Sequence, residues 1–434
     1  MTARLALHWQ IMIAIVLAAL CGYVGGKQWH VLGITLYSAY ALLGTLFLNA
    51  LKMIIVPLVV STIITGVAGI GNESGFARLG IKTLLYYAST ALLAILTGLM
   101  MVNLFEPGLA GGGQLAASHS EAEMAAVMSK VEGRGGGDLV EIFVRMVPPN
   151  VIAAAADGQM LGLITFSLLF GFFMVRAAGE NAGVLTGFWQ GMSDTMMALT
   201  MWIMKFAPIG VFGLVAKTVA DTGFSAFQPL LVFFMTVVLA LAVHVFVTIP
   251  MLVMVLGKLH PRAFFTGIAP AMLTAFSTAS SSATLPVTME CLQKNIGVSK
   301  RVSSFVLPLG ATVNMDGTAL YECVAAMFIA QAYGVELSFA SQMMIVVLAL
   351  MTSIGVAGIP AASLVAISII LGAVGLPMEG IGLLLVTDRI LDMMRTSANV
   401  LGDCSGAVVV ATLENETRQP STDALPSLHL REAG

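Results

Sequence analysis

Long apolar runs separated by short polar stretches dominate the first 257 residues of this chain. Their length and spacing predict helices over 7–26, 31–70, 79–105, 140–178, 183–219 and 227–257. A helix of roughly 20 apolar residues crosses a bilayer core, so this pattern is typical of a membrane protein. The run over 31–70 exceeds one crossing, and we therefore expect a long tilted helix or a bend near Pro57.

Two later segments have a different pattern, in which small and hydroxyl residues interrupt the apolar sequence. Residues 262–293 contain a run of Ser, Thr and Ala that ends at Pro286, and residues 340–377 contain a small-residue middle with Pro360. Backbone that is not helical at membrane depth is tolerated only where protein or water satisfies its polar groups. We therefore expect each segment to form a re-entrant helical hairpin with its tip near the membrane middle.

Each predicted hairpin precedes a helix that carries polar groups. Residues 309–318 include Asn314 and Asp316, and the helix predicted over 380–413 carries a longer set of polar residues. A hairpin followed by a polar helix, given twice and entering from opposite membrane faces, indicates inverted repeats. The expected fold class is an all-α polytopic membrane protein whose site lies where the two repeats meet.

The composition agrees with a membrane location. Charged residues make up 10% of the chain, against about 25% in soluble proteins, and 58% of the residues are hydrophobic. A net charge of −3 without a basic tract gives no electrostatic basis for binding nucleic acid. Eleven basic residues outside the predicted spans fall on the side of the N-terminus and four on the other side, which favours cytoplasmic termini.

Five polar residues of the helix over 380–413 lie on one face, which we call the polar stripe. They are Asp388, Asp392, Arg395, Asn399 and Asp403, spaced 4, 3, 4 and 4 residues apart. At about 100° per residue they share an arc of about 60–80°. A charge at the bilayer centre costs roughly 2.5–3.5 kcal/mol on insertion scales, so the stripe must face a wet or polar cavity.

Counting the charges of the polar stripe together with Asp316 leaves two acids without a partner. Asp392 and Arg395, at i and i+3, can neutralise each other, and Arg389, about 100° from the stripe, is expected to pair with Asp388. Asp316 and Asp403 then have no protein cation. They are either protonated or compensated by a bound cation.

The neighbours of these two acids favour a bound cation. They supply neutral hard oxygens of the kind that replaces water around a small ion: Thr312, Asn314, Asn399 and the carbonyls around Gly310 and Gly317. Glu322, a further acid on the helix of Asp316 with no basic neighbour in sequence, is the best candidate for proton coupling.

The remaining charges suit an acidic amino acid. Arg395 cannot lose its charge, and its planar fork matches a carboxylate, while Asp392 can receive an ammonium group. A second carboxylate could accept hydrogen bonds from hydroxyl, amide and free backbone N–H groups near the hairpin tips. The candidate side chains are Ser281, Ser282, Thr318 and Asn399.

Three motifs carry a resemblance to a known family. They are Ser280-Ser281-Ser282, Asn314-Met315-Asp316-Gly317-Thr318 and Asp392-Met393-Met394-Arg395-Thr396 with Asn399 and Asp403. Together with the sequence around Pro57 and Phe206–Phe212, they resemble the dicarboxylate/amino acid:cation symporter family, and the likeness covers most of the chain.

The resemblance implies a homotrimer with eight membrane helices and two hairpins in each subunit. Scaffold helices 1 and 2 would occupy residues 1–78 and scaffold helices 4 and 5 residues 139–220. A transport domain would comprise helix 3 (79–105) and residues 221–413, and would slide across the membrane like an elevator. Residues 106–138 would form an extracytoplasmic loop and 414–434 a cytoplasmic tail.

The resemblance also implies roles for individual residues. Asp392 would hold the substrate's amino group, Arg395 its side-chain carboxylate, and other residues would complete the pocket: Ser281, Ser282, Thr318, Ile359, Ser363, Thr396 and Asn399. Three sodium sites would be formed by Gly310, Asn314, Asn399 and Asp403, by Thr312, Ser353, Ile354 and Val356, and by Tyr87, Thr90, Asn314 and Asp316.

Three positions depart from the family pattern. Ala91 stands where sodium-coupled members often have a hydroxyl, which puts the third sodium site in doubt. Val356 replaces a frequent Thr, which matters less if its carbonyl is the ligand. Ala279 stands where some members have an arginine at the hairpin tip.

The function expected is uptake of L-aspartate or L-glutamate across the cell inner membrane, driven by sodium and without an organic cofactor. Proton coupling, a C4-dicarboxylate substrate and cystine uptake are the alternatives within the class, and an anion leak is a further possible activity. An intramembrane enzyme would need Ser281 as nucleophile, or Asp316 with Asp403 as an acid pair. No base accompanies the serines in sequence, and His244, alone in an apolar helix, is expected to pack rather than catalyse.

Overall fold

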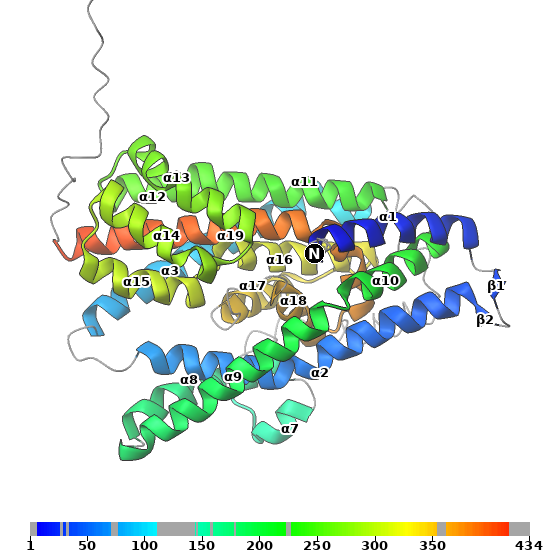
Figure 1. The fold of residues 1–434 in the computed structure, drawn as a ribbon, viewed down its shortest axis with the longest axis horizontal. Helices are drawn as coiled ribbons and strands as arrows, with labels where there is room; N and C mark the ends of the chain where they lie inside the picture. Colours follow the sequence, from blue (N-terminus) through cyan, green and yellow to red (C-terminus); the bar gives the residue numbers. More distant parts are fainter. Residues whose placement is uncertain are drawn as a thin grey trace, which may run out of the picture.

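The computed structural model describes residues 7–26, 29–31, 34–70, 77–110, 144, 146–156, 159–177, 179–222, 227–353 and 362–415. Nearly all of these residues are helical, and many of the helices lie along the long axis of an elongated bundle (Figure 1). The predicted helical class is therefore confirmed.

One group of helices comes from the N-terminal half of the chain. Its members are α1 (Leu7–Gly25), α2 (Leu36–Ile70), α8 (Met160–Ala177), α9 (Ala182–Met204) and α10 (Ala207–Thr222). In this group α1 packs on α10, and α2 packs on α8, α9 and α10. In Figure 1, α2, α9 and α10 run obliquely to α11 and α19. The helices of the predicted scaffold thus pack on one another, while their immobility during transport stays a prediction.

Three predicted helix limits in this group are wrong. A short antiparallel pair, β1 (His30–Val31) and β2 (Ile34–Thr35), precedes α2, which begins at Leu36 and runs through Pro57 without a break. The helix expected over 140–178 appears in the described residues as α7 (Val151–Ala156) followed by α8. Pro148 and Pro149, just before α7, disfavour helical backbone in the residues that precede them.

The helix expected over 183–219 is also divided. A single helical turn, η2 (Gly179–Asn181), leads into α9, and α9 and α10 are bent by 55° at a break around Lys205 and Phe206. Pro208 lies in the first turn of α10, where proline is tolerated. In the interior of a continuous helix the same proline would cause a kink or a break, so it disfavours a straight continuation of α9 into α10.

The second group of helices surrounds α16 (Asp316–Ala332). It includes α3 (Ala77–Phe105), which is followed by η1 (Pro107–Leu109), and α11 (Phe227–Val243), which continues through a π-helical segment, η4 (His244–Thr248), into α12 (Ile249–Val255). The continuous helix predicted over 227–257 is confirmed. Every residue of α16 except Gln331 is buried, so its polar side chains lie in the interior of the bundle.

The first predicted hairpin forms. Helix α13 (Pro261–Thr278) turns at Ala279 into α14 (Ser281–Glu290), which ends in a π-helical segment, η5 (Cys291–Ile296). Ala279 has the left-handed conformation (φ 49°, ψ 40°), and the Ser280 hydroxyl accepts a hydrogen bond from the Ala283 N–H at 3.3 Å, which caps α14. Its entry into the membrane from one face stays a prediction.

The second hairpin is described in its two arms. They are α17 (Phe339–Ser353) and α18 (Ala362–Val374), which pack on each other, and η6 (Met378–Gly380) leads from them into α19 (Ile381–Leu413). Residues 354–361 lie outside the described part of the chain. Helix α15 (Lys300–Val313) is separated from α16 by Asn314 and Met315, whose backbone is not helical, as the sequence predicted.

Among the described residues, two helical segments are long and apolar enough to cross a bilayer, Leu79–Leu109 and Gln228–Val255. The bent pair α9–α10 would be a third if it forms one span. The count of eight membrane helices stays a prediction.

Candidate functional site

The polar stripe of α19 is buried along its whole length. Its five side chains belong to residues that are between 1% and 8% exposed, and α19 packs against α13, α15 and α16. The stripe therefore meets protein groups rather than lipid, and these groups divide its two ends into clusters of different chemistry.

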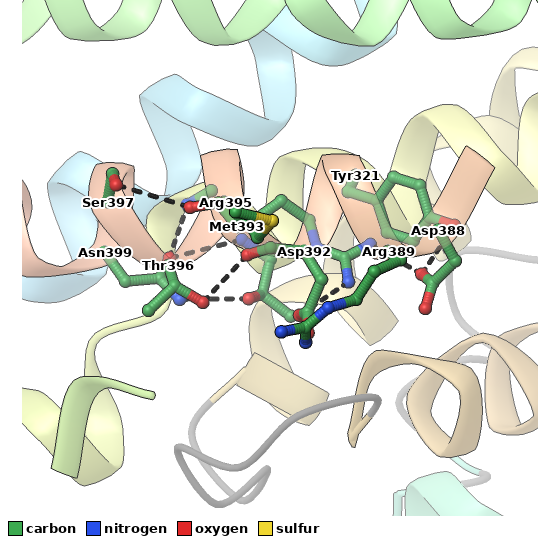
Figure 2. Close-up of polar contacts among 11 residues, drawn as sticks. Tyr321, Asp388, Arg389, Asp392, Met393, Arg395, Thr396, Ser397 and Asn399 are labelled. Atoms are coloured by element: carbon green, nitrogen blue, oxygen red, sulfur yellow. Dashed lines mark hydrogen bonds and ion pairs between the residues drawn. The ribbon is translucent and has the colours of Figure 1, made fainter. Parts of the chain in front are cut away.

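The first cluster, which we call the ion-pair cluster, is centred on Arg395. Its guanidinium donates from Nη1 to Asp388 Oδ1 at 3.1 Å and from Nη2 to Asp392 Oδ1 at 2.9 Å (Figure 2). The Tyr321 ring lies 3.9 Å from the guanidinium carbon, and the Tyr321 hydroxyl donates to Asp388 Oδ1 at 3.2 Å. Two carboxylates and an aromatic face therefore hold this arginine in one orientation.

Arg389 joins the same cluster, but not as predicted. Its Nη1 lies 3.6 Å from Asp392 Oδ2, so it pairs with Asp392 rather than with Asp388. The expected pairing of Arg389 with Asp388 is therefore wrong. The cluster contains two carboxylates and two guanidinium groups.

Asn399 links the polar stripe to the start of α16. Its Oδ1 accepts hydrogen bonds from the N–H groups of Gly317 at 2.8 Å and Thr318 at 3.3 Å, and its Nδ2 donates to Thr318 Oγ1 at 3.0 Å. These N–H groups belong to the first turn of α16, where no intrahelical acceptor is available. The amide of Asn399 thus fixes α19 to the interrupted segment between α15 and α16.

The second cluster, which we call the acidic cluster, contains the two acids that the sequence left unpaired. Asn314 Nδ2 donates to Asp403 Oδ1 at 3.0 Å, and Thr90 Oγ1 donates to Asp316 Oδ1 at 3.2 Å. Tyr87 lies against the same group, since a methyl group added at Gly310 would come within 2.6 Å of its hydroxyl and 2.5 Å of Asp403 Oδ1. The structure therefore brings five predicted cation ligands together from α3, α15–α16 and α19.

His244 is a member of the acidic cluster that sequence reasoning missed. Its Nε2 lies 3.2 Å from Asp316 Oδ2, and the residue is fully buried. The sequence signal was a single polar residue in an otherwise apolar helix, without any indication of its partner 72 residues away. Its prediction as a buried packing residue is confirmed, but its contact with a buried carboxylate was not predicted.

Glu322 is buried on α16, and in the described contacts it forms no hydrogen bond to either cluster. Its Oε2 accepts a hydrogen bond from Thr352 Oγ1 at 2.7 Å, whereas its Oε1 has no hydrogen-bond partner among the described residues. Glu322 also forms no ion pair within the described ranges. One arm of the second hairpin thus contacts this acid directly.

The other predicted site residues differ in their exposure. Four of them are buried: Ser281, Ser353, Ser363 and Thr396. Ser282 is exposed, and in the described contacts the Thr312 hydroxyl donates only to carbonyls of its own helix. Ser281 and Ser282 are in α14, which packs against α15 and α19. Ile354, Val356 and Ile359 lie outside the described residues.

The donor set of the acidic cluster suits a small hard cation. Across the described ranges, no group of three or more His, Cys, Asp or Glu side chains could hold a metal ion. The cluster instead offers carboxylate, amide and hydroxyl oxygens, and the buried Asn314 Oδ1 accepts no hydrogen bond from a described residue. A carbonyl-type oxygen of this kind is a ligand for a monovalent or alkaline-earth ion rather than a transition metal.

Comparison with known proteins agrees with this chemistry. The profile described as "Sodium:dicarboxylate symporter family" matches residues 7–413. The "Proton/glutamate-aspartate symporter" of Escherichia coli (strain K12) is 34% identical over 418 residues, which cover 95% of this chain and 94% of that protein. The "Proton/sodium-glutamate symport protein" of Geobacillus stearothermophilus is 34% identical over 415 residues, with 95% and 96% covered. "Excitatory amino acid transporter 3" of Homo sapiens is 35% identical over 420 residues, with 87% and 80% covered.

Proposed function

Because the chain belongs to the sodium:dicarboxylate symporter family, we propose that it takes up L-aspartate or L-glutamate together with sodium. The protein is a transporter and not an enzyme, and transport of this kind requires ions but no organic cofactor.

The single observation that supports sodium coupling most strongly is the charge balance of the acidic cluster. Asp316 and Asp403 are buried, and in the described residues neither forms an ion pair with Lys or Arg. The basic side chain in contact with them is His244, 3.2 Å from Asp316, and in the described contacts it does not pair with Asp403. The neutral amide of Asn314 is the hydrogen-bond donor to Asp403. A buried carboxylate without a counter-ion is costly, so binding a cation here stabilises the folded site.

The ion-pair cluster supports an acidic amino acid as substrate. Arg395 would exchange a bond to Asp388 or Asp392 for the substrate's side-chain carboxylate, and Asp392 would then receive the ammonium group. Residues around the start of α16 and the hairpins would bind the other carboxylate and complete the pocket: Ser281, Ser282, Thr318, Ile359, Ser363, Thr396 and Asn399.

Three sodium positions are proposed around these groups. The first uses Gly310, Asn314, Asn399 and Asp403, and the third uses Tyr87, Thr90, Asn314 and Asp316, with Asn314 shared between them. The second, beneath the other hairpin, uses Thr312, Ser353, Ile354 and Val356. Ala91 offers no hydroxyl to the third position, so that position is expected to bind sodium least tightly.

We place the protein in the cell membrane, as a homotrimer with cytoplasmic termini. Scaffold segments 1–78 and 139–220 would stay fixed while residues 79–105 and 221–413 carry the site across the bilayer. Such an elevator movement gives access to each side in turn.

Uptake into proteoliposomes tests the coupling ion. Labelled L-aspartate uptake is measured with an inward sodium gradient at equal pH, and then with a pH gradient in choline on both sides. We expect accumulation above equilibrium only with the sodium gradient. Uptake that is indifferent to sodium would refute this assignment.

Proton coupling is the second candidate, because of Glu322. This acid is fully buried, and one carboxylate oxygen has no partner among the described residues. If protons drive transport, the pH gradient alone would support accumulation and Glu322→Gln would abolish it. If sodium drives transport, Glu322→Gln would leave sodium-driven exchange measurable.

A further inference from the structure

A second guanidinium group lies beside the carboxylate that we assign to the substrate's amino group. Asp392 contacts two arginines of its own helix, Arg395 Nη2 at 2.9 Å on Oδ1 and Arg389 Nη1 at 3.6 Å on Oδ2 (Figure 2). The two contacts use different oxygens, so both can exist together. Asp392 therefore already has two positive partners before any ligand binds.

The two arginines differ in how firmly they are held. Arg395 is enclosed, with two short hydrogen bonds and the Tyr321 ring against it. The Arg389 side chain is 22% exposed, its contact to Asp392 is longer, and its buried Nε donates to no described residue. Within the described part of the chain, Arg389 thus retains free hydrogen-bonding capacity and can keep or leave Asp392 without giving up another partner.

Substrate binding changes what Asp392 needs. When a ligand carboxylate takes Arg395, Asp392 loses its closest positive partner. An amino acid replaces it with an ammonium group. A dicarboxylate without an amino group brings no replacement, and a buried carboxylate left without a counter-ion disfavours binding strongly. Arg389 is the cation that remains within reach of Asp392.

We propose that Arg389 is a specificity-determining residue, which serves as an internal counter-ion of Asp392 and so admits C4-dicarboxylates without an amino group besides acidic amino acids. This inference rests on the proposed function, in which Asp392 and Arg395 bind the substrate. Because a guanidinium group stays protonated, the counter-ion is present at any physiological pH.

The test compares two ligands on the purified full-length transporter in sodium buffer. Calorimetry measures the dissociation constants of L-aspartate and succinate for the wild type, Arg389→Gln and Arg389→Lys. Lys294→Gln is the matched control, because Lys294 is a surface cation whose side chain is 72% exposed and pairs with Glu290 on a helix turn. Elution as a single species and the melting temperature show that each variant is folded.

We expect Arg389→Gln to weaken succinate binding by about tenfold or more while L-aspartate binding changes by less than about threefold, as for loss of one partner of a desolvated charge pair. Arg389→Lys should retain part of the succinate affinity, and Lys294→Gln should change neither constant. Equal losses for the two ligands would overturn the proposal, as would a wild type that binds L-aspartate but not millimolar succinate.

A double substitution separates a charge effect from a packing effect. In an Asp392→Asn background the side chain at position 392 needs no counter-ion, so adding Arg389→Gln should no longer weaken succinate binding. The same loss in both backgrounds would assign Arg389 a structural role and overturn the proposal. A wild type that binds neither ligand would instead refute the proposed function itself.

Discussion

At the residue scale, the two ends of the polar stripe differ in how their charges are compensated. Arg395 and Arg389 balance Asp388 and Asp392 within the ion-pair cluster, whereas among the described residues Asp403 receives only the neutral amide of Asn314. Substitutions at the two ends should therefore change different properties. The ion-pair cluster should affect ligand selectivity, and the acidic cluster should affect sodium dependence.

Asp403→Asn should remove most of the dependence of L-aspartate affinity on sodium. In the wild type a cation at Asp403 and a substrate one helix segment away stabilise the same arrangement, so each raises the affinity for the other. The variant removes the charge that attracts the cation and keeps the side-chain shape. Titration of L-aspartate in sodium and in choline at constant pH measures the effect.

The control for this titration is Asp194→Asn on α9. Asp194 is exposed and accepts a hydrogen bond from Gln190, four residues earlier, so its charge is far less costly in the folded protein. It should leave the sodium dependence unchanged. Equal affinities in sodium and choline for the wild type would contradict the role of the acidic cluster.

Asp392→Ala should weaken L-aspartate binding much more than succinate binding. The substitution removes the group that receives the ammonium, and it also frees Arg389 and Arg395 from their shared carboxylate. A loss of about 30-fold or more for L-aspartate corresponds to breaking a desolvated charge pair. Parallel losses for both ligands, measured by calorimetry, would contradict the assignment of the amino group to Asp392.

The sequence located the charges better than it located their partners. The spacing of Asp388, Asp392, Arg395, Asn399 and Asp403 predicted one helix face, and all five are buried on it. The partner of Arg389 could not be predicted, because a long side chain reaches either neighbouring acid and the rotamer decides which. His244 reaches Asp316 through tertiary packing of α11 and α16, which no local pattern encodes.

At the element scale, the site depends on close approach between α19 and the break between α15 and α16. Gly402 faces this break, and a methyl group there would lie 2.7 Å from Asn314 Nδ2 and 2.8 Å from Asp316 Oδ2. Both contacts are too short for a carbon atom. The glycine therefore sets the separation at which Asn314 can bond Asp403.

Gly402→Ala should separate these elements and impair the acidic cluster. We expect a stability loss of about 1–3 kcal/mol, as for an overpacked core, and a large loss of sodium-dependent L-aspartate binding. Gly66→Ala on α2 is the control, since an added methyl group there meets nothing within 4 Å. Normal sodium dependence in a folded Gly402→Ala variant would show that the separation is not critical.

Helix existence was predictable from the sequence, whereas several helix limits were not. Apolar runs such as 227–257 specify a helix by length alone, and the structure contains it as α11, η4 and α12. The division between α9 and α10 lies beside Lys205 and Pro208, local signals that a hydropathy average over the whole run does not register. The short pair β1–β2 occupies the start of the run over 31–70, which hydropathy likewise reads as one helix.

At the scale of the whole molecule, α18 connects the two groups of helices. It packs on α16 of the second group and on α17, and it also contacts α2 and α8 of the first group. Ile63 of α2, Ile164 of α8 and Ile369 of α18 lie in one buried apolar cluster. If the transport domain moves past a fixed scaffold, these contacts must separate during every transport cycle.

A cross-link across this cluster should therefore stop transport without stopping binding. We propose cysteines at Ile63 and Ile369, bridged by mercury, in a background in which the native cysteines are replaced by alanine; these are Cys21, Cys291, Cys323 and Cys404. Each single-cysteine variant treated with mercury is the control. L-Aspartate binding should persist, because the polar stripe lies on α19, which packs on α13, α15 and α16 away from this cross-link. A bridged pair holds α18 against α2. Transport by the cross-linked protein at the rate of the controls would therefore mean that these helices stay in contact throughout the cycle, and it would contradict the elevator movement.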